Sequence, residues 1–128
     1  MLFDTNVLSE LARPRPDARV LAWAAERDVL ALSVVSVEEL RFGVLARRSA
    51  RLLRWLDGLL ERSEVLPITR AIAERAADLR ALRQRAGRPV TQADMLIAAT
   101  AIAHGYPLAT RNARDFAGIG LRVIDPFA

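Results

Sequence analysis

The sequence contains no cysteine and has a single histidine, His104. The absence of cysteine excludes disulfide bonds, thiolate nucleophiles and cysteine-based zinc sites. One histidine cannot supply a multi-histidine zinc site, so any bound metal must rest mainly on oxygen ligands, which suit magnesium, manganese or calcium. No apolar run approaches the roughly 20 residues that span a bilayer, and the first residues lack the basic segment and apolar stretch of a secretory signal. We therefore expect a cytoplasmic protein.

Lysine is also absent, so all 19 basic residues are arginine, against 15 acidic residues and a net charge of +4. Arginine binds phosphate through paired hydrogen bonds and stacks on bases, which favours a nucleic-acid partner. A GC-rich genome would produce the same composition without such a partner. Arg47, Arg51 and Arg54 have nearly helical spacing and predict a basic stripe, for which a solvated face is the commoner explanation.

Short apolar runs alternate with helical stretches along the 128 residues. The expected strands are 1–3, 29–33, 65–66, 108–109 and 121–124. The expected helices are one capped by Asp17 through 26, one capped by Ser36 through 47, one over about 51–62, one capped by Thr69 through 85, and one capped by Thr91 that ends at 104 before Gly105. Strands separated by helices predict a three-layer α/β/α sandwich with a mostly parallel central sheet. The length predicts one domain over 1–128.

Four carboxylates, Asp4, Glu39, Asp94 and Asp115, fall where such a sheet would gather them. Sites in open α/β sheets form beyond the carboxyl ends of the strands. Asp4 directly follows the first strand, and Asp115 lies in the segment that leaves strand 108–109. Glu39 and Asp94 lie in the first turns of helices that begin at the same edge. We expect the four to converge on one site for Mg²⁺ or Mn²⁺, because these ions prefer oxygen ligands.

Each of these acids also has a purely structural explanation. Asp4 could cap the helix that follows it. Ser36 and Glu39 have the spacing of a capping box, in which each side chain binds the other residue's backbone N–H. Asp115 could be an ordinary loop or cap residue. For Glu39, the nearby Gly43 favours a functional role, because it leaves room over that helix face.

Asp94 has the strongest physical argument. It could cap its helix, but it shares a helical face with Ile97, Ala98 and Ala101. A carboxylate on a core-facing stripe is costly unless it is paired, hydrogen-bonded or bound to a cation. We therefore favour a cation at Asp94.

Taken together, four segments resemble the PIN-domain family, and within it the VapC-like toxins of type II toxin–antitoxin systems. They are DTNVLS at 4–9, ELRFG at 39–43, DMLIAATA at 94–101 and TRNARDF at 110–116. They occur in order and cover nearly the whole chain, which is more specific than any one short motif. The family pattern places its acid immediately before the Leu-Arg-x-Gly segment, which selects Glu39 rather than Glu38.

The resemblance implies a PIN-like nuclease domain that hydrolyses RNA with Mg²⁺, or Mn²⁺ in its place. It assigns Asp4, Glu39, Asp94 and Asp115 to the acidic quartet that binds the metal and carries catalysis. Thr5, Asn6, Thr110 and Asn112 would be supporting polar residues. The resemblance further implies a homodimer and a cognate antitoxin that inserts a segment into the active-site groove and presents an arginine to the carboxylates.

Two other functions remain open on the sequence. A module of the same fold could bind RNA or protein without cutting, although the four acids argue against it. A magnesium phosphatase with an aspartate nucleophile usually needs a second aspartate two residues on and then a glycine, where this chain has Asn6 and Val7. Family members usually carry a fuller first strand than the three residues before Asp4, which leaves open a start upstream of Met1.

Overall fold

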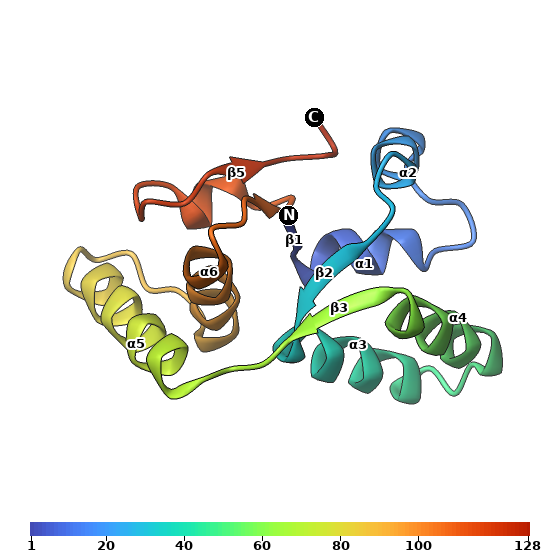
Figure 1. Ribbon diagram of the computed structural model, residues 1–128, viewed down its shortest axis with the longest axis horizontal. Helices are drawn as coiled ribbons and strands as arrows, with labels where there is room; N and C mark the ends of the chain where they lie inside the picture. The colour runs from blue at the N-terminus through green and yellow to red at the C-terminus, as the bar shows by residue number, and fades with distance from the viewer.

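The computed structural model describes residues 1–128 and consists of one parallel sheet with helices on both faces (Figure 1). The sheet has five strands in the order β3-β2-β1-β4-β5, all parallel. The strands are β1 (Leu2–Phe3), β2 (Leu30–Ser33), β3 (Ser63–Leu66), β4 (Leu108–Ala109) and β5 (Val123–Ile124). The helices are α1 (Thr5–Leu11), α2 (Ala18–Ala25), α3 (Val34–Ala46), α4 (Ala50–Glu61), α5 (Arg70–Arg85) and α6 (Gln92–His104), with a short 3₁₀ turn η1 (Ala113–Phe116). The predicted α/β/α sandwich is confirmed.

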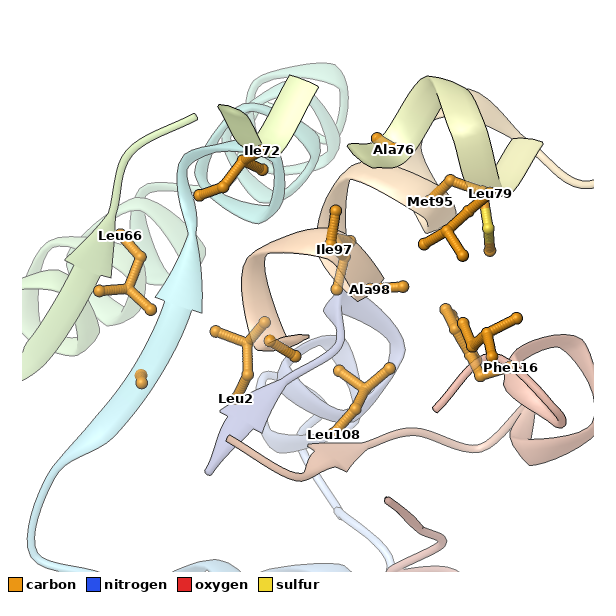
Figure 2. Close-up of a cluster of buried hydrophobic side chains, with 14 residues drawn as sticks. Leu2, Leu66, Ile72, Ala76, Leu79, Met95, Ile97, Ala98, Leu108 and Phe116 are labelled. Carbon is orange, nitrogen blue, oxygen red and sulfur yellow. The ribbon is translucent and has the colours of Figure 1, made fainter. Parts of the chain in front are cut away.

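Alternation along the short central strands divides the core into two parts. Leu2 faces α5 and α6, whereas its neighbour Phe3 faces α1 to α4, because successive strand residues point to opposite sides of a sheet. Figure 2 shows the first part, in which Leu2 and Leu108 lie beside Ile97 of α6. Leu2, Phe3 and Leu108 are all fully buried, and each such side chain contributes roughly 2 kcal/mol. This burial on both faces of the sheet offsets the small number of backbone hydrogen bonds that two-residue strands such as β1 and β4 can form.

Several helix boundaries follow the predicted caps. Asp17 accepts a hydrogen bond from Arg19 N–H before α2, and Thr69 Oγ1 and Thr91 Oγ1 cap α5 and α6 in the same way. Gly105 ends α6 with φ of 65°, a left-handed conformation that glycine adopts without strain. The Arg-Pro-Arg-Pro segment at 13–16 separates α1 from α2, because proline lacks the backbone N–H that a continuing helix needs.

The prediction that Ser36 caps a helix is wrong. The α3 helix begins three residues earlier, directly after β2, and Ser33 Oγ accepts the capping bond from Val35 N–H at 3.1 Å. The two serines are one helical turn apart, so sequence spacing alone could not separate them. Ser36 instead lies fully buried inside the first turn of α3.

The predicted arginine stripe is also divided by the structure. Arg47 is the C-terminal cap of α3, whereas Arg51 and Arg54 belong to α4, which begins after the Ser49 cap. The other differences are small shifts at element ends: β3 starts at Ser63 rather than 65, and β5 covers only Val123–Ile124. No helix is both long and apolar enough to cross a lipid bilayer.

Candidate active site

Asp4 lies at the carboxyl end of the central strand, where it caps α1. Its Oδ1 accepts Thr5 N–H at 2.7 Å, and its Oδ2 accepts the Thr110 hydroxyl at 2.7 Å. The Asn6 amide also reaches Oδ2, at 3.4 Å. Thr110 directly follows β4, which pairs with β1, so two adjacent strand ends hold this carboxylate in one orientation. The capping role anticipated for Asp4 and its place at the strand edge therefore occur together.

Burial makes the ionised form of Asp4 unfavourable. The residue is only 4% exposed. Burial is the largest cause that raises the pKa of Asp4 from 3.8 to about 6, and the nearby charges of Asp94 and Glu39 raise it further, against the lowering effect of the bonds from Thr110 and Thr5. A cation beside Asp4 would relieve this cost, because an opposite charge favours the carboxylate.

Glu39 is positioned by a hydroxyl chain that sequence reasoning did not find. Thr5 Oγ1 donates to Glu39 Oε1 at 2.7 Å and lies 2.9 Å from the buried Ser36 Oγ. Because Thr5 has one hydroxyl hydrogen and gives it to the carboxylate, Ser36 must donate to Thr5. Ser36 thus supports Glu39 through Thr5 rather than through a capping box. A serine three residues before a glutamate could not reveal this, since the spacing is the same for both arrangements.

Asp94 is the third residue of α6, and its N–H donates to the Thr91 cap at 3.1 Å. Partial burial is the main cause that raises the pKa of Asp94, and the charges of Asp115 and Glu39 raise it further. Ile97, Ala98 and Ala101 on its side of α6 are buried, as the helical spacing predicted. Asp94 is therefore close enough to the other three acids for their charges to interact with its own.

One cleft of about 800 Å³ gathers Asp4, Glu39 and Asp94 along its wall. The lining also includes the predicted supporting residues Thr5, Asn6 and Asn112, together with the apolar Leu40, Val44, Leu52 and Trp55 and the basic Arg13, Arg47, Arg51 and Arg111. Asp4 and Glu39 follow the carboxyl ends of β1 and β2, and Asp94 lies in the first turn of α6, so the cleft begins where open parallel sheets place their ligands.

Asp115 does not line this cleft. It is exposed on the 3₁₀ turn η1 and borders a second, smaller hollow with Thr91 and Asp94. Asp94 lines both hollows and is thereby the link between Asp115 and the other two acids. The structure thus places three of the predicted acids together and the fourth beside Asp94.

The supporting polar residues hold one another as well as the acids. Asn6 Nδ2 donates to Thr110 Oγ1 at 3.3 Å, while Asn112 N–H donates to the same hydroxyl at 3.1 Å. Thr110 therefore takes part in a backbone turn and also donates to Asp4. Asn112 itself lines the cleft.

The donor set suits a hard divalent cation. None of the four acids takes part in any of the five salt bridges, so no arginine neutralises them. No three of these side chains are close enough to enclose an ion between them. Mg²⁺ does not require such a cage, because it commonly binds through one or two carboxylates and keeps several waters. The residues therefore fit a partly hydrated Mg²⁺ or Mn²⁺ on the cleft wall.

Comparison with known proteins agrees with this geometry. A PIN-domain family model matches residues 1–120. The chain is 38% identical to VapC ribonuclease Y4jK of Sinorhizobium fredii, over 99% of this chain and 97% of that protein. Among solved structures, it resembles FitAcB from Neisseria gonorrhoeae with a TM-score of 0.84 and 34% identity, covering 98% and 97% of the two chains. It resembles a toxin–antitoxin complex from Klebsiella pneumoniae with a TM-score of 0.76 and 33% identity, covering 98% and 96%.

The parallel sheet, its acidic edge and these matches define the class of protein: the chain belongs to the PIN-domain family. Within that family it groups with the VapC ribonuclease toxins of toxin–antitoxin systems.

Proposed function

We propose that this chain hydrolyses RNA phosphodiester bonds with a divalent metal held by Asp4, Glu39, Asp94 and Asp115, Mg²⁺ being the natural ion and Mn²⁺ a substitute. The observation that carries the proposal is the convergence of Asp4, Glu39 and Asp94 on one cleft without any cationic partner. Four acids would give the bare site a charge of −4 if all were ionised, which one divalent ion would reduce to −2.

The bound ion would lower the pKa of an attacking water and neutralise charge that develops on the phosphate. The chain's own residues orient the carboxylates for this chemistry. Thr110 and Thr5 orient the carboxylates of Asp4 and Glu39 by hydrogen bonds of 2.7 Å each. The Thr91 cap fixes the first turn of α6 and with it Asp94. Because these partners are already in place, no side chain has to reorganise to bring the acids to the cleft.

The test compares RNA cleavage by purified wild type and by Asp94→Asn, each with added Mg²⁺, with Mn²⁺ or with EDTA. We expect wild type to cut only with a metal and Asp94→Asn to lose at least about 100-fold in rate. Asp78→Asn is the matched control, because Asp78 is an exposed acid on α5 outside both hollows. Equal cleavage by wild type and Asp94→Asn would refute the site assignment. Metal-dependent RNA binding without cleavage would favour the alternative of an inactive PIN-like binding module.

We also infer a cognate antitoxin as protein partner, which would act with this toxin in the cytoplasm. The support is the likeness to a toxin–antitoxin complex, together with the composition of the cleft. Its apolar residues, among them Leu52 and Trp55, suit the face of an inserted segment, while the acids at its end suit an arginine from that segment. Copurification with the product of the adjacent gene, and its loss on Trp55→Glu, would test this partner.

A homodimer is the second assembly that we propose. Phe42 and Leu45 lie three residues apart on α3 and are 70% and 53% exposed. Large side chains exposed together often mark an interface. Light scattering should give twice the mass of one chain for wild type and a smaller mass for Phe42→Ser. A wild-type mass of one chain at micromolar concentration would contradict the proposal.

A further inference from the structure

Arg111 is a basic residue that lines the cleft beside the acidic edge of the sheet. It follows Thr110, whose hydroxyl holds Asp4. The backbone N–H of Arg111 donates to Asn6 Oδ1 at 3.2 Å, and the same Asn6 side chain reaches Asp4 through its amide group. The start of the Arg111 side chain is therefore tied to the network that orients the candidate metal ligand.

Two contacts hold the guanidinium group at the cleft that Arg111 lines. Its carbon lies 3.9 Å from the centre of the Phe127 ring, which is the geometry of a cation–π contact. Its Nη2 lies 3.5 Å from Glu10 Oε1, at the outer limit of a hydrogen bond. Stacking on a ring fixes the plane of the group without using its N–H donors.

Glu10 is already satisfied by other donors. This carboxylate is only 5% exposed and accepts Asp17 N–H at 2.9 Å and Arg13 Nη1 at 3.2 Å. The Asp17 N–H is the largest cause that lowers the pKa of Glu10. The bond to Arg111 is the longest of the three and therefore the weakest, so Glu10 keeps its two shorter hydrogen bonds if Arg111 turns to another acceptor. With its side chain 52% exposed, Arg111 keeps most of its five donors for another acceptor.

We propose that Arg111 binds the RNA phosphate next to the one that is cut, with its guanidinium plane set in advance by Phe127. The inference rests on the proposed function, because it takes RNA to be the ligand of the cleft. A polyanion that approaches four carboxylates needs positive charge on the same wall. A planar, stacked guanidinium offers paired donors that match two phosphate oxygens, and little side-chain freedom remains to be lost on binding.

The first experiment measures binding of a short fluorescein-labelled single-stranded RNA of mixed sequence at several salt concentrations, in the Asp94→Asn background so that the probe stays intact. Loss of one phosphate contact should reduce the slope of log affinity against log salt by about 0.7. We expect this reduction, with about 10-fold weaker binding, for Arg111→Ala. Arg111→Lys keeps the charge but not the paired donors, so its slope should stay near wild type while its affinity falls several-fold.

Arg114→Ala is the matched control, because Arg114 is an exposed arginine of the same segment that does not line the cleft. Its slope should equal that of the parent protein. The second experiment measures cleavage with otherwise wild-type protein, where Arg111→Ala should raise KM about 10-fold and change kcat little, since a flanking contact contributes equally to substrate and transition state.

The inference is overturned if Arg111→Ala keeps the parent salt slope and KM, even if its melting temperature falls. Arg111 would then have only a structural role, through its contacts with Phe127 and Glu10. A reduction of the same size in Arg114→Ala would also overturn it, because the effect would then be one of general charge. These outcomes are distinct from failure of the proposed function, which is absence of cleavage by wild type, because the salt slope is measured without cleavage.

Discussion

Replacement of Asp4 by asparagine should stabilise the metal-free protein at neutral pH. The carboxylate is buried, and its pKa in the folded state is about 6, against 3.8 for the ordinary group. The folded state therefore binds the proton more tightly than the unfolded state does. Protonated Asp4 carries no penalty below pH 3.8, and the penalty grows as pH rises until it is complete above about pH 6.

The size of the penalty follows from the shift. About two pKa units at 1.36 kcal/mol per unit give about 3 kcal/mol of destabilisation at pH 8. Asparagine keeps an oxygen for Thr5 N–H but presents an amide group to the Thr110 hydroxyl, and this mismatch costs about 1 kcal/mol. The net expectation is about 2 kcal/mol greater stability for Asp4→Asn at pH 8, and about 1 kcal/mol lower stability at pH 3.5, where Asp4 is protonated.

Urea unfolding in EDTA at pH 3.5, 6 and 8 measures the difference between wild type and Asp4→Asn. The exposed Asp78→Asn variant controls for general charge effects and should stay within about 0.5 kcal/mol of wild type at every pH. A difference of the same sign and size at all three pH values would refute the reasoning, because it would show that ionisation of Asp4 does not oppose folding. Lower stability of Asp4→Asn at pH 8 would refute it equally.

Three further predictions concern metal binding, the Thr110 hydroxyl and the buried Arg83. Mg²⁺ at about 100 times its Kd should stabilise wild type by about 2.7 kcal/mol in urea unfolding, and should stabilise Asp94→Asn much less. Thr110→Val removes a hydrogen bond that lowers the pKa of Asp4, so the acidic limb of the pH–rate profile for RNA cleavage should move to higher pH. An unchanged limb would show that the Thr110 hydroxyl does not influence cleavage through the pKa of Asp4. Arg83→Met removes the buried bond from Arg83 on α5 to the Ala117 carbonyl, so the free energy of unfolding should fall by about 1–3 kcal/mol in urea, and no change would show that this bond is dispensable.

The fold and the acidic edge could be foreseen because they depend on local patterns. Caps such as Thr91 and the glycine after α6 mark helix ends by chemistry that acts within one turn. The position of Asp4 follows from a general property of parallel sheets, which place sites beyond their carboxyl ends. Asp94 could be singled out because a carboxylate on an apolar helical face conflicts with burial.

The residues that were missed depend on contacts between distant parts of the chain. Ser36 and Ser33 are equally good caps by sequence, and only the direct passage from β2 into α3 decides between them. Thr5 and Arg83 donate to partners 34 residues away, the Glu39 carboxylate and the Ala117 carbonyl. No local spacing encodes such pairs, so only the assembled fold reveals them.

The most direct test of the central claim is sequencing of the 5′ ends produced when purified protein acts on total RNA in Mg²⁺. If the acids of the cleft hold the metal as proposed, wild type should give a reproducible set of new ends that disappears with EDTA and with Asp94→Asn, while Asp78→Asn gives the wild-type set. The same ends from Asp94→Asn, or from wild type in EDTA, would show that cleavage does not depend on this carboxylate site.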